Sequence, residues 1–174
     1  GAHVKLISGP VNLPAPAHVE RVSITTAEDM LQASLEGVSN CDIFIACAAV
    51  ADYRPTSIAE HKIKKGNEEI MELHLVKNPD IVATIAARED KPFTVGFAAE
   101  TRDVLSYAQG KLERKNLDLI IANDVSQAGI GFNSDENAVT LVTRDTHIDI
   151  PQTSKRQLAT LLIEQISQLY KTSK

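Results

Sequence analysis

The sequence predicts an α/β protein with a Rossmann-like, mainly parallel sheet flanked by helices. Short runs rich in Val and Ile alternate with segments of helical period, an order typical of βαβ units. The run Asp42 to Ala48 is apolar after its first residue, as expected of a strand covered on both faces. The 174 residues, 43% hydrophobic and 24% charged, are enough for a core and argue against disorder. We therefore expect a single domain over residues 1–174.

The first part of the chain is expected to hold two strands and a helix. The strands cover Val4–Ser8 and Val19–Ile24, which alternate with turn residues. Thr26 and Asp29 have the spacing of a capping box, so a helix should begin there. Gly37 is expected to end this helix, since glycine commonly follows a last helical turn.

A strand and a helix are expected next. The apolar stretch Ile70–Val76 predicts a strand, which leads into a turn. In that turn Asn78 would cap a helix, Pro79 would take its first position and Asp80 would meet the positive end of its dipole. We expect this helix to run to about Arg88.

The pattern then repeats before it changes. A strand over Phe93–Ala98 precedes a helix that Thr101 would cap and that runs to about Lys115. The next strand, Leu117–Ala122, ends at Asn123 and Asp124. Apolar runs in residues 138–142 and 147–150 flank a polar segment, which predicts a late hairpin over 137–150. In 151–174, the capping-box spacing of Ser154 and Gln157 predicts an amphipathic helix.

Composition argues against two broad functions. The chain has 18 basic and 23 acidic side chains, a net charge of −5, 4% aromatic residues and no Trp, which is unlike nucleic-acid-binding surfaces. No apolar run reaches the ~18 residues of a membrane-spanning helix, and no secretion signal is visible. We expect a cytoplasmic protein with no nucleic-acid or membrane partner. Cys41 and Cys47 lack metal-ligand spacing and are expected to be reduced core thiols.

Candidate functional residues follow the expected strands, because ligands of open α/β sheets bind beyond the carboxyl ends of strands. The carboxylate of Asp52 would ligate a metal or accept a hydrogen bond from a ligand hydroxyl; alternatively, it would pair with Arg54 or cap a turn. Lys62, Lys64 and Lys65 form a positive cluster in an acidic chain. An anion such as a triphosphate would relieve their repulsion, and a solvated charge run is the alternative.

Two expected helices add candidates. The helix start at residues 78–82 offers free backbone N–H groups to a polar ligand. Lys111 and Lys115 share a helix face, where they would bind an anion or simply complement the helix dipole. Tyr107 and Lys111 also match the Tyr/Lys spacing of short-chain dehydrogenases. An NAD(P)-dependent short-chain reductase is therefore an alternative, although the chain has no G-x-G-x-x-G motif.

Several short motifs occur in order along nearly the whole chain. They are Ala48–Arg54, Lys62–Lys65, Val76–Ile81, Val95–Thr101, Lys115–Asp118, Ala122–Val125 and Gly131–Asp135. In combination they resemble the bacterial phosphopantothenoylcysteine synthetase family, the synthetase half of a bifunctional coenzyme A biosynthesis protein. Each motif alone is unspecific, and the specificity of the resemblance lies in their combination and order.

The resemblance implies a CTP-dependent ligase that joins 4′-phosphopantothenate to L-cysteine. The substrate carboxylate would attack the α-phosphate of CTP, giving an acyl-cytidylate and pyrophosphate, and the cysteine amine would then displace CMP. Such chemistry needs cations on a triphosphate, usually with Mg²⁺, and stabilisation of the charge that develops. FMN would belong only to the fused decarboxylase half, outside these residues.

The resemblance also implies roles for individual residues. Lys62 matches the family's catalytic lysine, which binds phosphate and assists turnover. Asn123 and Asp124 would lie on the substrate side, and Asp52 would lie near the triphosphate and its metal. The positions that match CTP contacts, besides Lys62, are Ala46, Cys47, Ala48, Asp52, Pro79, Asp80, Ile81, Val82, Phe97, Lys111 and Lys115.

The sequence departs from the family pattern at its start. The family's first strand, loop and helix, which hold an asparagine associated with the acyl-cytidylate, have no counterpart after Gly1. We therefore expect residues 1–174 alone to be inactive or impaired, and a non-catalytic nucleotide-binding fragment is a further alternative. The family also implies a homodimer, with the late hairpin as a contact, and a larger assembly through the decarboxylase half.

Overall fold

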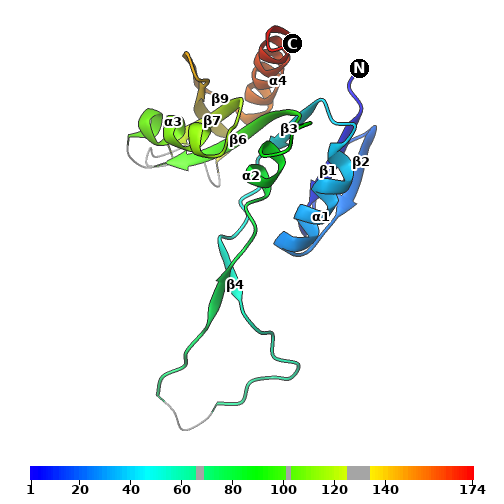
Figure 1. Ribbon diagram of the computed structural model, residues 1–174, viewed down its shortest axis with the longest axis vertical. Helices are drawn as coiled ribbons and strands as arrows, with labels where there is room; N and C mark the ends of the chain where they lie inside the picture. Colours follow the sequence, from blue (N-terminus) through cyan, green and yellow to red (C-terminus); the bar gives the residue numbers. More distant parts are fainter. Residues whose placement is uncertain (66–68, 101–102, 125–133) are drawn as a thin grey trace. The chain divides into compact units, whose positions relative to one another are not determined.

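The structure, a computed structural model, describes residues 1–65, 69–100, 103–124 and 134–174 (Figure 1). The expected cap Thr101 and the motif residues Val125 and 131–133 lie outside the described residues. The described chain forms two compact units. Unit 1 comprises Gly1–Glu36 and Ala49–Ile81, and unit 2 comprises Gly37–Ala48 and Val82–Lys174.

Unit 1 begins with a small parallel sheet and a helix. Strands β1 (Val4–Ser8) and β2 (Val19–Ser23) pair in parallel, which confirms both expected strands. Helix α1 (Ala27–Val38) starts with the expected capping box: Thr26 Oγ1 accepts from the Asp29 N–H at 3.1 Å, and Asp29 Oδ2 accepts from the Thr26 N–H at 2.9 Å. The Thr26 N–H first, then the Thr26 side chain and the Thr25 N–H, lower the pKa of the Asp29 carboxyl by hydrogen bonding to it. The helix continues through Gly37, so the prediction that Gly37 ends it is wrong by one residue.

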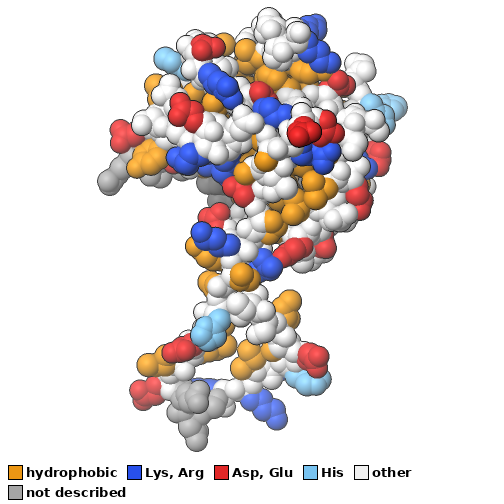
Figure 2. Space-filling view, in the orientation of Figure 1, with side chains coloured by type: hydrophobic (Ala, Val, Ile, Leu, Met, Phe, Trp, Pro, Cys, Tyr) orange, Lys and Arg blue, Asp and Glu red, His pale blue; other side chains and the backbone are white. Residues whose placement is uncertain are grey.

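The second part of unit 1 is a narrow antiparallel ribbon; we call the described residues between its two strands, 56–65 and 69–74, the extended segment. Strands β4 (Tyr53–Pro55) and β5 (Leu75–Lys77) pair, and the Thr56 N–H donates to the His74 carbonyl at 2.9 Å. The expected strand over Ile70–Val76 is therefore wrong except at its last two residues. Figure 2 shows apolar side chains exposed along this segment, and Ile70 is 79% exposed. A strand needs a partner and a buried face, and the apolar pattern alone supplies neither.

Unit 2 is built on a five-stranded sheet in the order β3-β6-β7-β8-β9. Its strands are β3 (Ile43–Ala46), β6 (Phe93–Glu100), β7 (Leu119–Asp124), β8 (Glu136–Val142) and β9 (His147–Ser154). The first three are parallel and the last two antiparallel, so the expected α/β class and late hairpin are confirmed. β3 is shorter and less buried than predicted for residues 42–48, because β6 is its single partner among the described residues.

Helices cover both faces of this sheet. On one face, α4 (Lys155–Thr172) packs Leu158, Leu162 and Ile166 against alternate residues of the strands, including Leu119 and Ile121. On the other face, α3 (Val104–Arg114) packs Ala108 and Leu112 against the intervening residues. The expected cap of the last helix is confirmed, since Ser154 Oγ accepts from the Gln157 N–H at 3.2 Å. None of the helices in the described ranges is long and apolar enough to span a membrane.

Two helix starts differ from the predictions. Helix α2 (Ile81–Ala86) has six residues and begins at Ile81, so Pro79 precedes it and it does not reach Arg88. Helix α3 follows Asp103, whose φ of 44° is left-handed and whose side chain makes no capping bond. Helix α2 thus starts later than the sequence signals suggest, because Asn78 bonds to Ala51 and Arg54 instead.

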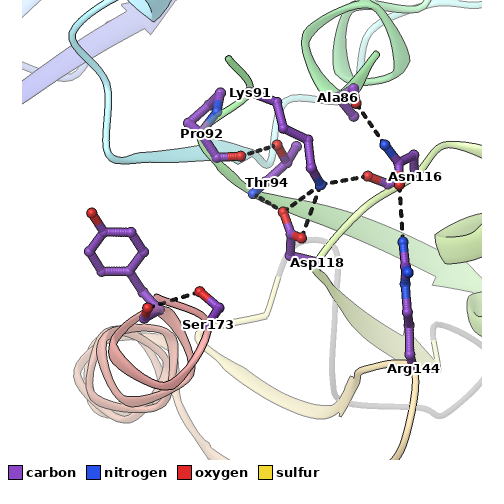
Figure 3. A network of polar contacts seen from close by, with 9 residues as sticks. Ala86, Lys91, Pro92, Thr94, Asn116, Asp118, Arg144 and Ser173 are labelled. Atoms are coloured by element: carbon purple, nitrogen blue, oxygen red, sulfur yellow. Dashed lines mark hydrogen bonds and ion pairs between the residues drawn. The ribbon is translucent and has the colours of Figure 1, made fainter. Parts of the chain in front are cut away.

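The amino ends of β6 and β7 are tied by a polar network (Figure 3). Lys91 Nζ donates to Asp118 Oδ1 and Oδ2 at 3.0 and 2.9 Å and to the Asn116 carbonyl at 2.9 Å. The Thr94 N–H donates to Asp118 Oδ2 at 2.8 Å. Asn116, in the left-handed region at φ 53°, accepts from Arg144 at 3.0 Å. These contacts fix the end of the sheet opposite to the one where ligands of such folds bind.

Candidate functional site

In unit 2, the carboxyl ends of three parallel strands meet at one edge, which we call the carboxyl edge. The register pairs Ala46 with Gly96, at the end of β3, and Asn123 and Asp124 with the last two residues of β6. Five of the candidates therefore lie on or directly after these strand ends: Ala46, Cys47, Ala48, Asn123 and Asp124. Phe97 lies within β6, directly after the residue that pairs with Ala46. Their assignment to a nucleotide and its substrate stays a prediction.

Lys111 is brought toward the carboxyl edge by an acidic partner. Its Nζ lies 3.8 Å from Glu100 Oε1, and both side chains are about three-quarters buried, at 31% and 24% exposure. Glu100 is the last residue of β6, so it holds the ammonium group of Lys111 near the strand end. Sequence reasoning missed Glu100 as a site residue, although a polar residue ending an apolar strand was available as a signal.

Lys115 occupies a different position from Lys111. It is the residue that ends α3, and its N–H donates to the Lys111 carbonyl at 3.1 Å. Asn116 follows it directly and belongs to the network at the amino ends of β6 and β7. Lys115 thus lies one helical turn farther from the carboxyl edge than Lys111. Only its long side chain would bring its ammonium group toward a ligand at that edge.

Phe97 and the two cysteines differ in burial. Phe97 is half-buried and packs against the core cluster on the α4 face of the sheet. Cys41 is half-buried, and burial raises the pKa of its thiol. Cys47 is exposed directly after β3, so the expectation that both thiols are core residues is wrong for Cys47. Strand β3 ends at Ala46, so Cys47 is not part of the sheet and its side chain is not covered by packing against it.

In unit 1, the candidate Asp52 is exposed just before β4. Within the described residues its carboxylate makes no hydrogen bond and no ion pair. The alternative that Asp52 pairs with Arg54 is wrong, because Arg54 Nη2 lies 2.5 Å from Glu28 Oε1 on α1. The structure therefore leaves the Asp52 carboxylate available to a ligand.

Asn78 connects the Asp52 loop to the start of α2. Its backbone N–H donates to the Asp52 carbonyl at 2.8 Å, and its Nδ2 donates to the Ala51 carbonyl at 2.8 Å. Its Oδ1 accepts from Arg54 Nη1 at 3.2 Å. The prediction that the Asn78 side chain caps the helix is therefore wrong, since these contacts occupy its side chain. The candidates Pro79, Asp80, Ile81 and Val82 follow directly, with Asp80 as the residue before α2.

Lys62 lies in the extended segment between β4 and β5. It is exposed, as are Lys64 and Lys65, and the neighbouring Ile63 is exposed as well. Gly66, which follows this cluster, lies outside the described residues. The cluster is accessible to an anion, and its exposure is equally typical of a solvated charge run.

Two other chemistries have less support. Among the described residues there is no group of three or more His, Cys, Asp or Glu side chains that would form a metal cage. Tyr107 is exposed, and Lys111 is paired with Glu100 and not with the Tyr107 hydroxyl. The Tyr/Lys pair that a short-chain reductase needs is therefore not assembled in the part of the chain that the structure describes.

A mainly parallel sheet with polar and cationic residues after its strands is an arrangement in which α/β proteins bind small ligands. Residues 1–170 match the family described as the DNA/pantothenate metabolism flavoprotein C-terminal domain, and this chain belongs to that family. Membership agrees with the resemblance found in the sequence motifs. It favours that interpretation over a short-chain reductase.

The relatives that this chain resembles in sequence are longer than the chain itself. It is 53% identical over 168 residues to the coenzyme A biosynthesis bifunctional protein CoaBC of Vibrio cholerae serotype O1, covering 95% of this chain and 42% of the relative. The Escherichia coli K12 protein of the same name is 51% identical over 175 residues, covering 98% and 43%. The chain therefore spans less than half the length of these relatives.

A solved structure supports the fold independently of sequence motifs. The crystal structure of the C-terminal domain of coenzyme A biosynthesis bifunctional protein CoaBC superposes with a TM-score of 0.81 and 35% identity. The match covers 99% of this chain and 76% of that chain. The α/β fold predicted from the sequence is thus shared with this domain.

Proposed function

We propose that this chain is a phosphopantothenate–cysteine ligase domain of coenzyme A biosynthesis. It would join 4′-phosphopantothenate to L-cysteine with CTP as the energy source, releasing pyrophosphate and CMP. The observation that carries the proposal is the family match over residues 1–170, together with about half of all residues identical to relatives named for coenzyme A biosynthesis. The motifs at the strand ends agree with it.

The chemical demand on the chain is to place charge around a triphosphate. The 4′-phosphopantothenate carboxylate attacks the α-phosphate of CTP, and pyrophosphate leaves; the cysteine amine then attacks the acyl carbon, and CMP leaves. Lys62 would bind phosphate oxygens and stabilise the charge that develops during turnover. Lys111, held by Glu100, and Lys115 would add positive charge for the nucleotide.

Other candidates would position the nucleotide without neutralising the charge of its triphosphate. The small residues Ala46, Cys47 and Ala48 permit close approach of the backbone, and Phe97 is one of few aromatic side chains available to a base. The segment Pro79–Val82 would contact the nucleotide by its backbone. Asn123 and Asp124, at the end of β7, would face the acyl side of the reaction.

Asp52 fits a role in holding Mg²⁺. Its exposed carboxylate has no partner among the described residues, and Mg²⁺ in nucleotide enzymes is usually held by one or two carboxylates plus substrate phosphates. Bound there, the ion would neutralise triphosphate charge and polarise the phosphoryl centre. A dedicated cage of protein ligands is not required for this mode of binding.

The assembly and location follow the same proposal. β9 is the last strand of the sheet among the described strands, and an unpaired strand edge can pair with another chain. The β8–β9 hairpin would thus contribute to a homodimer, and a larger assembly would form through an FMN-dependent decarboxylase half, since the relatives are named as bifunctional. The protein would act in the cytoplasm.

The decisive experiment measures pyrophosphate release by the protein expressed with its natural flanking sequence. We expect release that requires both CTP and 4′-phosphopantothenate, followed by amide formation when L-cysteine is added. CTP binding without any release would indicate a non-catalytic nucleotide-binding fragment. Fluorescence enhancement of NADH with no response to CTP would overturn the proposal in favour of a reductase.

A further inference from the structure

Three side chains of unit 1 form a bracket around the Asp52 loop: Glu28 on α1, Arg54 in β4 and Asn78 after β5. The guanidinium of Arg54 lies 2.5 Å from the Glu28 carboxylate at one nitrogen. Its other terminal nitrogen donates to the Lys77 carbonyl at 2.8 Å and to Asn78 Oδ1 at 3.2 Å. One planar group on β4 thus joins a helix to the end of β5 and the residue after it.

Asn78 completes the bracket with two bonds to consecutive carbonyls. Its N–H and its Nδ2 donate to Asp52 and Ala51, each at 2.8 Å. These bonds fix the backbone on which Asp52 is carried and leave the Asp52 carboxylate exposed. The next residues along the chain are Pro79, Asp80 and Ile81, so the same asparagine also sets where that segment begins.

The contacts of the bracket contribute more to the geometry of the loop than to the stability of the fold. Arg54 and Glu28 are only about half-buried, at 40% and 46% side-chain exposure, and a pair at such exposure contributes little to stability. By contrast, the ability of a rigid fork to hold three acceptors at once is specific to arginine. Such a device is suited to holding a loop in one geometry.

We propose that Arg54 and Asn78, supported by Glu28, are positioning residues that orient the Asp52 carboxylate relative to the segment 79–81 for the metal-bound triphosphate. The inference rests on the proposed function, because it assigns both segments to CTP. Misplacing a catalytic contact by about 1 Å can cost ~100-fold in rate. The bracket therefore acts on the nucleotide step and not on the later attack by cysteine.

The test compares Arg54→Lys and Asn78→Asp with the unchanged protein in its natural flanking sequence. Lysine keeps the charge but cannot reach all three acceptors, and aspartate keeps the acceptor for Arg54 but cannot donate to Ala51. We expect kcat/KM for CTP to fall by about 10- to 100-fold, with a higher Mg²⁺ requirement. The KM for cysteine should stay unchanged.

A matched control is available in the same unit. Arg21 also donates to a backbone carbonyl, that of Leu13 at 3.0 Å, but touches no candidate residue. Arg21→Lys should leave the KM for CTP and the Mg²⁺ requirement unchanged. Should Arg54→Lys fail to fold, Glu28→Gln provides a milder variant that leaves Arg54 in place. We expect the same parameters to move in the same direction, by about 2- to 5-fold, as for loss of a part-exposed pair.

The outcomes separate the inference from the proposed function. An unchanged protein without CTP-dependent activity would overturn the proposed function itself. An active protein in which the Arg54 and Asn78 variants keep the KM for CTP and the Mg²⁺ requirement would overturn only the positioning role. A fall in kcat with every KM and the Mg²⁺ requirement unchanged, matched by an equal loss of folded protein in a thermal melt, would also contradict it.

Discussion

The extended segment between β4 and β5 and the β6–β7 pair of strands use the same apolar residue types in opposite ways. In the segment, Ile58 is 90% exposed, whereas in β7 Ile121 is fully buried. The segment carries Lys62, and the strand pair carries the core against which α3 and α4 pack. The contrast indicates that the proposed catalytic lysine and the stability of the fold depend on different residues.

The largest expected effect is on activity in the extended segment. Lys62→Gln should abolish amide formation, with a loss of about 1000-fold, because a neutral amide cannot stabilise charge developing on the phosphoryl group. The melting temperature should not change, since Lys62 is exposed. Coupled detection of pyrophosphate and of the amide product, together with a thermal melt, would measure both.

Lys65→Gln is the matched control for Lys62. It removes a positive charge from the same exposed cluster, at a position three residues after Lys62. If the cluster acts only through its summed charge, both variants should lose activity equally. Near-normal turnover by Lys62→Gln would show that its role has been misassigned.

The second effect concerns stability and compares one substitution in the strand pair with one in the extended segment. Ile121→Ala should lower the free energy of unfolding by about 3 kcal/mol, because it leaves a cavity between the sheet and α4. Ile58→Ala should change it by less than ~0.5 kcal/mol. Urea denaturation of the two variants would provide the comparison. Equal losses would mean that the extended segment packs against a partner in solution.

The sequence was informative where local signals and burial agree. The capping boxes at Thr26 and Ser154 and the late hairpin were all predictable, because each depends on residues close in sequence. The order of strands and helices was predictable for the same reason. That the carboxyl ends of β3, β6 and β7 lie at one edge followed from the parallel class of the sheet.

The remaining features depend on contacts distant in sequence. Ile70–Val76 has a strand pattern, but among the described residues its pairing with β4 as a strand begins only at Leu75. Asn78 has the position of a cap, yet bonds to Ala51 and Arg54, 27 and 24 residues away, compete for its side chain. Glu100 became a candidate only when α3 placed Lys111 beside it. No local pattern encodes such pairings.

The third effect distinguishes two glycines within unit 2. A Cβ on Gly96 would lie 2.8 Å from Leu117 Cδ1, which is buried and cannot move away. Gly96→Ala should therefore destabilise the protein by about 1–3 kcal/mol. Gly110 lies inside α3, where a Cβ would meet only the flexible end of Arg114 at 3.1 Å. Gly110→Ala should stabilise by ~0.5–1 kcal/mol, and denaturation curves of opposite shift would confirm the difference.

The smallest effect concerns an exposed contact within the packed unit. The Tyr170 hydroxyl donates to Asp42 at 2.5 Å, and this bond, followed by the charge of Lys174, lowers the pKa of the Asp42 carboxyl. Because the pKa is lower in the folded state, the stabilisation is present above about pH 4 and is lost as pH falls through the folded pKa.

Tyr170→Phe should remove most of that pH dependence and little else. The ring keeps its edge contact with Phe93, 6.1 Å between centroids, and its place under Lys174. NMR titration should therefore show the Asp42 pKa rising, while remaining somewhat below its ordinary value because Lys174 is still 3.6 Å away. An unchanged Asp42 pKa would assign the shift to Lys174 alone. At neutral pH, loss of this exposed contact in unit 2 should thus change the free energy of unfolding as little as a substitution in the extended segment. This holds although the neighbouring residues Ile43 and Leu169 pack against the core.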